Sequence, residues 1–307
     1  MKISLIILFL ISTLFADARM QVHMGTVISI KVDDKNASDE VFELFRELDE
    51  SLSTYKSDSE ISKLNRYGKL RLASRTKTVL ERSLEISKLT NGVFDVTIGA
   101  LSHGAYHFGA KERVPSKTEL KEALLNVGAS KLRIKDDYAF LSHGAIVDLG
   151  GIAKGYAVDL SIELLKKRGT DSAVVAASGD IGCIGACEIF ITDPFSPNKI
   201  FATIHSTLPI FAVSTSGNYE RYIKNKTHNH LLNPKTGKSQ QLFASVTLMD
   251  SGDNTRLDAL ATAVSIMNLK DALAILEREK ISFVLVLNGG EIFKSELPDG
   301  ITVEVAP

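Results

Sequence analysis

The segment from Val147 to Asp159 reads VDLGGIAKGYAVD and places acidic, glycine and basic residues close together. Asp148 lies between strand-forming residues, Gly150 and Gly151 follow it, and Lys154 begins an alanine-rich, helix-like run. Glycine lets the backbone turn tightly or approach a ligand closely, and the amides at the start of a helix attract anions. The segment therefore suits a phosphate-bearing ligand, although a strand-to-helix turn capped by Asp148 explains it equally well.

A second candidate site is the pair Asp258 and Thr262, which stand four residues apart in an expected helix. Residues at this spacing lie on one helical face. A carboxylate and a hydroxyl, joined by a backbone carbonyl from elsewhere, suit Mg²⁺, which prefers oxygen ligands. Alternatively, Asp258 caps the helix and Thr262 bonds the carbonyl four residues before it.

His230 precedes an Asn-Pro turn and is a candidate general base, because the unperturbed pKa of histidine lies near neutral pH. The alternative is a half-buried, hydrogen-bonded histidine, and His228 competes for the same role. Tyr55 and Phe94 are candidates for stacking on an aromatic ring such as a flavin or adenine, with core packing as the alternative.

Hydrophobic periodicity predicts the elements that must position these residues. Helices are expected over 38–54, 77–89, 117–127, 152–167, 256–267 and 270–280. Strands are expected over 22–32, 132–134, 138–141, 173–177, 188–192, 201–205, 210–214, 244–249, 283–287 and 302–305. The strands cluster in runs and no linker is evident, which favours one α+β domain with largely antiparallel sheets and packed helices.

Composition excludes several classes of protein. The chain has 307 residues, 44% of them hydrophobic, so it can bury a sizeable core and is not expected to be disordered. Its 36 basic and 37 acidic residues give a formal net charge of −1. Neither a nucleic acid nor an anionic membrane surface is therefore a favoured partner.

The N-terminus predicts export. Lys2, an apolar run from Ile3 to Phe15 and an A-x-A pattern at Ala16-Asp17-Ala18 are typical of a signal peptide. We expect a signal peptide over 1–18, a single domain over 19–307 and a periplasmic location. No cysteine follows the apolar run, so lipid attachment there is not expected, and an uncleaved signal would tether the protein. In an oxidising compartment, Cys183 and Cys187 form either a small disulfide or two free thiols.

Eight blocks occur in an order that resembles the ApbE family of FAD:protein FMN transferases. They begin with MGT at Met24, STY at Tyr55 running into SEISKLN, and GVFDVT around Phe94. They continue with DLGGIAKGYAVD, the turn GD at Asp180, TSGNY, HLLNPKTG from His230, and DALAT from Asp258. The likeness covers Met24 to about Ala263, and ordered blocks are far more specific than a lone glycine pattern.

The resemblance implies a single compact ApbE-like (T-fold-like) domain and a Mg²⁺-dependent enzyme. Such an enzyme transfers FMN from FAD to a Thr or Ser hydroxyl of a target protein and releases AMP. By position, His230 would be catalytic, and Gly151, Asp258, Ala261 and Thr262 would bind the metal, Gly151 and Ala261 through carbonyls. The residues expected to contact FAD are Met24, Tyr55, Val93, Phe94, Asp95, Asp148, Lys154 and Leu232.

The resemblance leaves other activities open, namely FAD pyrophosphatase activity giving FMN and AMP, or non-catalytic flavin binding. It implies acceptors that carry an S/T-G-A-S/T-type motif, such as respiratory electron-transfer subunits. The chain departs from the family at Ser178, where glycine is usual, and at Asn218 and Asn233, where aspartate is common. These departures concern affinity and side activity more than reaction class.

Overall fold

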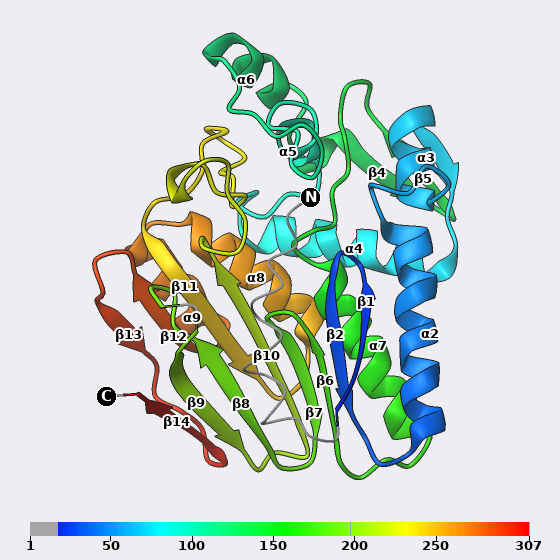
Figure 1. Cartoon of the computed structure of the whole chain (residues 1–307). Helices are drawn as coiled ribbons and strands as arrows, with labels where there is room; N and C mark the ends of the chain where they lie inside the picture. The colour runs from blue at the N-terminus through cyan, green and yellow to red at the C-terminus, as the bar shows by residue number, and fades with distance from the viewer. Residues whose placement is uncertain (1–17, 197, 307) are drawn as a thin grey trace.

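The computed structural model describes residues 18–196 and 198–306, so the expected signal peptide lies outside the described residues except for Ala18. Its central feature is an eight-stranded antiparallel sheet (Figure 1). In spatial order the strands are β1 (Arg19–His23), β2 (Thr26–Lys31), β6 (Ala173–Ala177), β7 (Asp180–Ile184), β10 (Ile210–Gly217), β11 (Phe243–Asp250), β12 (Ser282–Leu287) and β13 (Ile292–Lys294).

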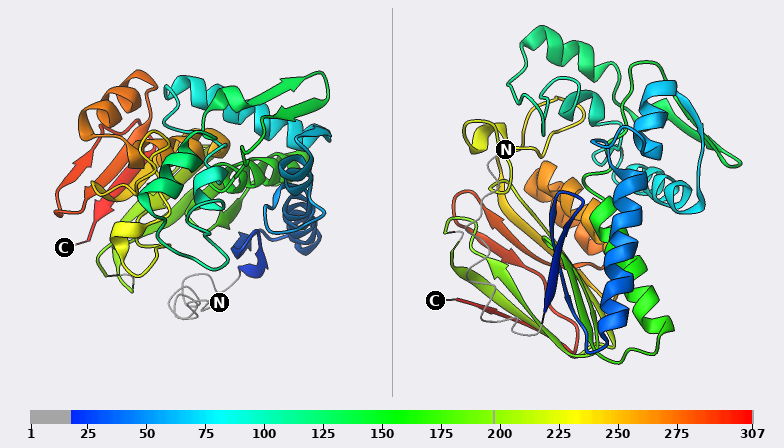
Figure 2. Two further views of the ribbon diagram at one scale, coloured as in Figure 1. Left: turned by 90° about the horizontal axis from the view of Figure 1, so that it is seen from above. Right: turned by 45° about the vertical axis from the view of Figure 1, so that its right-hand side comes forward.

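Helices cover one face of this sheet (Figures 1 and 2). They are α2 (Lys35–Leu52), α4 (Ser74–Leu89), α7 (Ala153–Lys167), α8 (Asn254–Ile266) and α9 (Leu269–Arg278). Helix α2 shows why: Val41, Phe45 and Leu48 recur at helical spacing and are buried, and the Asp34 carboxylate caps the first turn. Helices α7 and α8 pack directly on β7, β10 and β11 and run antiparallel, so the N-terminal turn of α7 lies beside the middle of α8.

A smaller three-stranded antiparallel sheet packs on the opposite face. It contains β8 (Cys187–Thr192), β9 (Ile200–Ser206) and β14 (Ile301–Val305) in the order β14-β9-β8. Ile189 and Ile204 from this sheet pack with Phe211 and Val213 from β10 in one buried cluster. The large sheet is therefore covered on both faces, which makes it a rigid platform for the loops at its ends.

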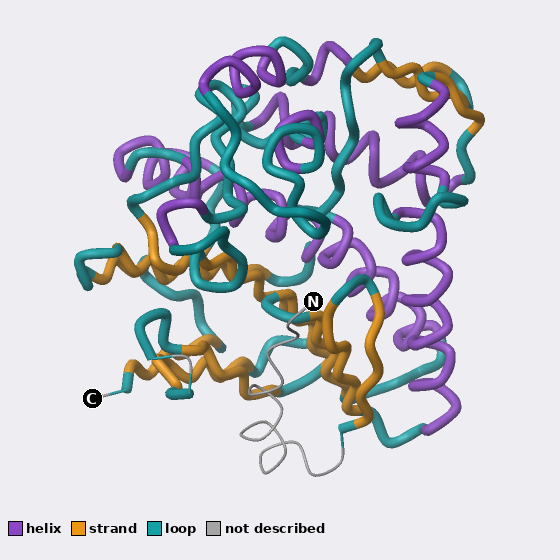
Figure 3. Tube along the Cα trace, turned by 45° about the horizontal axis from the view of Figure 1, so that its top comes forward, coloured by secondary structure: helices purple, strands orange, loops and turns teal. Residues whose placement is uncertain are grey.

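A third group of short elements lies beyond the end of the large sheet (Figure 3). It comprises α3 (Glu60–Tyr67), α5 (Gly99–Ser102), α6 (Lys117–Leu124) and a sheet of β3 (Lys69–Arg71), β5 (Tyr138–Leu141) and β4 (Leu132–Lys135). Two 3₁₀ turns, Ala129–Lys131 and Lys226–His228, complete the elements. Leu101, Tyr106 and Phe108 form a small core here with Ile223 and Leu232, which joins α5 to the loop carrying His230.

The expected α+β architecture, with largely antiparallel sheets in one domain, is confirmed. The single strand expected over 22–32 is wrong, because Met24 and Gly25 have φ values of 50° and 75° and form a two-residue hairpin turn between β1 and β2. Helix α3 was not expected, because only Ile61 and Leu64 mark its buried face. In the part of the chain that the structure describes, no helix is both long and apolar enough to cross a membrane.

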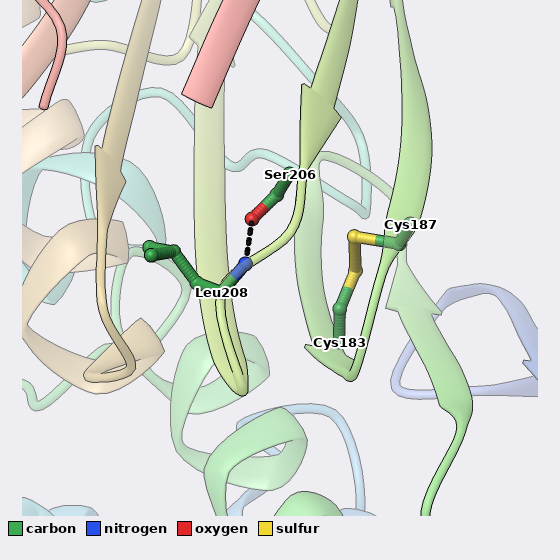
Figure 4. The surroundings of a disulfide bond; sticks show 4 residues. All are labelled: Cys183, Cys187, Ser206 and Leu208. Carbon is green, nitrogen blue, oxygen red and sulfur yellow. Dashed lines mark hydrogen bonds between the residues drawn. A yellow bond between two sulfur atoms is a disulfide. The ribbon is translucent and has the colours of Figure 1, made fainter. Parts of the chain in front are cut away.

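Cys183 and Cys187 form a disulfide that closes the turn between β7 and β8 (Figure 4). Cys183 is fully buried in the cluster between the two sheets, whereas Cys187 is partly exposed. In the neighbouring turn, the Leu208 N–H donates to the Ser206 hydroxyl at 3.2 Å (Figure 4). The disulfide thus fixes the end of β7 farthest from Asp180.

Reduction of this disulfide should cost little stability, because a loop of this length contributes only about 2 kcal/mol through chain entropy. Urea unfolding with and without a reductant measures the difference. Cys187→Ser should resemble reduction, whereas Cys183→Ser should destabilise further, since it places a hydroxyl in an apolar cluster. A loss above about 4 kcal/mol on reduction would contradict this view of the disulfide as a local constraint.

Candidate active site

The backbone before Asp148 is held by two neighbouring segments. The Asn65 amide donates to the Val147 carbonyl at 2.9 Å and accepts from the Val147 N–H at 2.7 Å. The Asp148 N–H donates to the Val96 carbonyl at 2.7 Å. The blocks containing Asn65, Val96 and Asp148 are therefore adjacent in space, which explains why a polar residue such as Asn65 ends an otherwise apolar helix face.

Asp148 does not cap the following helix, because α7 begins after Ile152 without a side-chain cap. Its carboxylate instead accepts from the Ser102 hydroxyl at 2.6 Å and from the Gly150 N–H at 2.9 Å, and His103 Nε2 lies 3.2 Å away. Burial raises the pKa of Asp148, but the hydrogen bond and charge of His103 together with the other two donors hold that pKa below its usual range. Asp148 is thus an ionised acceptor, and Ser102 and His103 are site residues that no spacing in the sequence indicated.

Lys154 bridges two carboxylates at the N-terminus of α7. Its Nζ lies 2.6 Å from Asp180 Oδ2 and 3.5 Å from Asp258 Oδ2. Burial alone would lower the pKa of Lys154, but the two carboxylates raise it above its ordinary value. Asp180 also accepts from the Ser214 hydroxyl at 2.5 Å, so this carboxylate, noted in the sequence only as part of a turn, is the main partner of Lys154.

Helices α7 and α8 approach closely at two glycines. A Cβ on Gly151 would lie 2.8 Å from Thr262 Oγ1, and one on Gly155 would lie 2.2 Å from the Asn254 carbonyl. The Gly155 N–H donates to Asp258 Oδ2 at 3.1 Å. Neither Gly150 nor Gly151 has a positive φ, so the pair is not needed for a tight turn. Glycine is needed at position 151 because a side chain there would clash with Thr262.

This arrangement fits a magnesium ion. Asp258, Ala261 and Thr262 lie on α8 at positions i, i+3 and i+4, with Thr262 against Gly151 and Asp258 against Gly155. Burial and the charge of Asp180 raise the pKa of Asp258 to about 7, so a cation beside it would stabilise the ionised form. Among the described residues no group of three or more His, Cys, Asp or Glu can hold a metal. A metal here would accordingly take hydroxyl and carbonyl oxygens besides the Asp258 carboxylate, which is the ligand type that Mg²⁺ accepts.

Two alternative roles for these residues are not observed. Asp253, not Asp258, caps α8, with its carboxylate accepting from the Arg256 N–H at 2.9 Å. Among the described residues, the Thr262 hydroxyl forms no hydrogen bond with the Asp258 carbonyl four residues before it, whereas the Ser265 hydroxyl makes a bond of this type to the Ala261 carbonyl at 2.8 Å. The side chain of Asp258 is instead directed at the Gly155 N–H and Lys154.

His230 is held in one tautomer by the backbone. The ring nitrogen Nδ1 lies 3.1 Å from the Arg221 carbonyl, and the backbone N–H of His230 donates to that same carbonyl. A carbonyl only accepts, so Nδ1 carries the proton and Nε2 keeps its lone pair. Burial lowers the pKa of His230 to about 4, and the charges of Arg221 and Lys154 also act to lower it. His230 is thus uncharged at neutral pH, and its Nε2 is able to accept a hydrogen bond or a proton.

The residues expected to contact FAD fall into two groups. Tyr55 is 59% exposed, its hydroxyl donates to the Phe108 carbonyl at 3.3 Å, and its ring meets His103 edge-on. Met24 is at the β1–β2 turn and is partly exposed. These two side chains, with those of Asp148 and Lys154, are available to a ligand.

The second group is more deeply packed. Phe94 is 4% exposed in the main core, and Leu232 lies in the small core beside α5. Asp95 accepts from the N–H and hydroxyl of Thr97, and burial raises its pKa. Val93 is partly exposed and packs against the main core. For Phe94 the packing that we weighed as the alternative to stacking is what the structure shows.

The departures from the family pattern also have structural meanings. Ser178 has a φ of 59°, a left-handed conformation that favours glycine. Asn233 Oδ1 accepts from the N–H groups of Lys235 and Thr236, which requires an oxygen but no charge. Asn218 donates to the Asn288 side chain at 2.9 Å, while its own Oδ1 is buried without a partner in the described chain.

Comparison with known proteins agrees with this geometry. The model of the ApbE family matches residues 24–285, which is most of the chain. The chain belongs to the ApbE family. An FAD:protein FMN transferase of Vibrio cholerae is 28% identical over 301 residues, covering 89% of this chain and 90% of the relative. One from Haemophilus influenzae is 27% identical over 303 residues, covering 89% and 87%.

Solved structures of ApbE-family proteins have the same fold. The ApbE protein of Thermotoga maritima superposes with a TM-score of 0.84 at 27% identity, covering 91% of this chain and 96% of its own. The flavin transferase ApbE of Vibrio cholerae gives a TM-score of 0.79 at 26% identity, with coverage of 91% and 96%. The resemblance carried by the eight blocks is therefore confirmed at the level of family and fold.

Asp159, the last residue of the DLGGIAKGYAVD block, holds α8 in place. Its carboxylate accepts from the N–H groups of Asn254 and Thr255, both at 2.8 Å, and from the Thr255 hydroxyl. Asp159→Ala should lower the free energy of unfolding by about 2–4 kcal/mol, because it strands buried donors at the start of α8. Asn268→Ala, which removes the N-cap of α9, should cost about 1 kcal/mol. Urea unfolding of both variants makes the comparison, and an equal loss in each would show that Asp159 has no special role.

Proposed function

We propose that the chain is a Mg²⁺-dependent transferase that moves FMN from FAD to a Thr or Ser hydroxyl of a target protein and releases AMP. The observation that carries this proposal is the buried cluster at the crossing of α7 and α8, where Lys154 Nζ lies 2.6 Å from Asp180 Oδ2 and 3.5 Å from Asp258 Oδ2. A buried cation thereby lies beside the oxygen ligands on α8, and His230, held by the Arg221 carbonyl, supplies the proton acceptor. Non-catalytic flavin binding would require neither a neutral buried His230 nor the Gly151–Thr262 approach.

The residues of the chain divide the work of binding. Tyr55 offers an exposed ring for stacking, and Asp148 offers an ionised acceptor for a hydroxyl or ring N–H of FAD. Lys154 and the first amides of α7 attract the pyrophosphate. Gly151, Asp258, Ala261 and Thr262 would hold Mg²⁺, which on binding supplies charge withdrawal from phosphorus and stabilisation of the leaving phosphate.

The transfer itself requires a proton acceptor beside the attacking oxygen. Nε2 of His230 takes the proton from the hydroxyl of the acceptor protein while the hydroxyl oxygen forms a bond to the FMN phosphorus. The bond from that phosphorus to the bridging oxygen breaks, and AMP leaves with the bonding electron pair. Lys154 offsets the negative charge that develops on the phosphate oxygens. The products are a phosphoester-linked flavin, AMP and the proton first held by His230.

We further propose that the protein acts in the periplasm after export. The signal-like N-terminus supports this location, and so does the Cys183–Cys187 disulfide, since disulfides persist in oxidising compartments. Acceptors with an S/T-G-A-S/T-type motif, such as respiratory electron-transfer subunits, are the partners that this function would serve.

A direct assay tests the function. The mature protein is incubated with FAD and Mg²⁺, with and without a protein domain bearing an S/T-G-A-S/T motif, while AMP release and acceptor mass are measured. Transfer predicts the mass of FMN on the acceptor, whereas AMP release with no acceptor modification would indicate FAD pyrophosphatase activity. Flavin binding without either product would refute an enzymatic role.

Asp258→Ala provides the matched metal test. It should abolish Mg²⁺-dependent turnover, since one removed catalytic carboxylate ligand typically costs orders of magnitude in rate. Asp250→Ala, at the end of β11 and outside the Lys154 cluster, should retain turnover. Calorimetric titration of Mg²⁺ into each protein supplies a readout that does not depend on activity, and unaltered Mg²⁺ affinity in Asp258→Ala would place the metal elsewhere.

The pH profile should reflect the lowered pKa of His230. The neutral imidazole is the active base, so kcat/KM for transfer at saturating Mg²⁺ should persist as pH falls below 6 and decline near the His230 pKa of about 4. A histidine with an unperturbed pKa would instead give a decline near pH 6.5, or about the reference value. His228→Gln should leave the profile unchanged, whereas His230→Gln should remove most transfer at every pH. A midpoint near neutral pH in the wild type would contradict the assignment.

A further inference from the structure

The chain carries a long basic segment around His230. From Arg221 to Met249 the sequence contains no Asp or Glu, but it does contain Arg221, Lys224, Lys226, Lys235 and Lys238. The whole protein has a formal net charge of only −1, so the remaining surface is on balance acidic. Positive charge is therefore concentrated in the segment that carries the proposed base.

This segment borders the site. It leaves the end of β10, passes over the edge of the large sheet next to α5 and α6, and returns to β11 (Figures 1 and 2). The Tyr106 hydroxyl donates to the Gly237 carbonyl at 2.9 Å, and Arg221 lies 3.3 Å from Glu112, which fixes the segment against the loop between α5 and α6. The segment that carries His230 is therefore packed against the loop between α5 and α6.

Not all of the positive charges are free to meet a partner. Arg221 is engaged with Glu112, and the Lys226 ammonium donates to the Pro194 carbonyl at 3.1 Å. Lys224, Lys235 and Lys238 are exposed, and within residues 18–196 and 198–306 no carboxylate forms an ion pair with them. We call these three lysines the basic rim.

We propose that the basic rim is the docking surface for the acceptor protein and that it recognises acidic residues flanking the target hydroxyl. This inference rests on the proposed transferase function and specifies its partner. The acceptor is favoured over FAD because the anion of FAD already has a buried cation at Lys154, whereas the rim lysines are exposed. It is favoured over an anionic membrane because the rim lysines belong to the same loop segment as His230, the base proposed to activate the hydroxyl of a protein.

Charge complementarity of this kind mainly raises the rate at which two proteins associate, and this effect weakens as the salt concentration rises. Exposed charges interact over a Debye length of about 8 Å at physiological ionic strength. Exposed ion pairs are individually weak. Reversing two rim charges should therefore weaken acceptor binding by about five- to twentyfold at low salt, with a smaller effect at high salt.

Two short peptides serve as probes. Both contain Ser-Gly-Ala-Thr, one flanked on each side by Asp and Glu and the other by Asn and Gln. Fluorescence anisotropy measures binding of each peptide to the full protein with FAD and Mg²⁺, at low and high salt. Mass spectrometry of the same mixtures measures FMN transfer separately. Peptide binding thus tests the rim, and peptide mass tests the transferase function.

The key variant is Lys235→Glu/Lys238→Glu, compared with Lys31→Glu/Lys166→Glu, which has the same change in net charge. Lys31 and Lys166 are exposed near the ends of β2 and α7. At 1.5 Å per residue, Lys166 is about 18 Å along α7 from Lys154. Neither pair belongs to the residues that we assign to FAD, metal or proton transfer, so the KM for FAD should be unchanged in both variants.

The rim is supported if the acidic peptide binds more tightly than the neutral one, if the preference weakens with salt, and if only the rim variant loses it. Equal binding of the two peptides, or equal loss in both variants, would overturn the proposal.

A rise in the KM for FAD in the rim variant would assign the lysines to FAD instead. Rim-dependent binding to phosphatidylserine vesicles without peptide binding would assign them to a membrane. Charge-dependent peptide binding without FMN transfer would refute the transferase function and leave the docking surface standing.

Discussion

The close crossing of α7 and α8 at Gly155 is the constraint on which the site depends. The Asn254 carbonyl occupies the space that any Cβ at position 155 would take, at 2.2 Å, and the Gly155 N–H donates to Asp258. Because the two helices are this close, residues before Gly155 on α7 face residues after Asn254 on α8. Lys154 thereby meets Asp258, and Gly151 meets Thr262. Asp159 secures the same crossing one turn later through the first amides of α8.

The crossing also explains how three charges can be buried together. Taking ions out of water is costly, and mutual attraction repays this cost only when the geometry and the hydrogen bonds are good. Lys154 faces two carboxylates, and Asp180 gains a further hydrogen bond from Ser214. Asp258 is the less well compensated partner, and its pKa is raised for that reason. The cluster thus has a net negative charge beside oxygen ligands, an environment that favours a divalent cation.

The sequence was sufficient for the elements and for the residues in continuous blocks. Helix α8 and the pairing of Asp258 with Thr262 follow from spacing four residues apart, and the strand runs give the antiparallel α+β class. The sequence could not show the reason for Gly151, because its neighbour Thr262 is more than a hundred residues away. It gave no signal for His103 or Ser102, whose contact with Asp148 depends on the pairing of residues 96–98 with residues 146–148. The Met24–Gly25 turn was hidden because apolar residues continue on both sides of it.

The site has two halves with different physical support. The α7–α8 half stands on a sheet covered on both faces, so its ligands are held by secondary structure and by a core that resists displacement. The His230 half is a loop, and its position depends on a few contacts: the Arg221 carbonyl, the Tyr106–Gly237 hydrogen bond and the packing of Leu232 beside Leu101. In the reaction that we propose, a phosphate and its metal would require fixed geometry, whereas an incoming protein acceptor would have to be admitted and released. The base would then lie on the loop and the phosphate ligands on the helices, so each task would fall to the half suited to it.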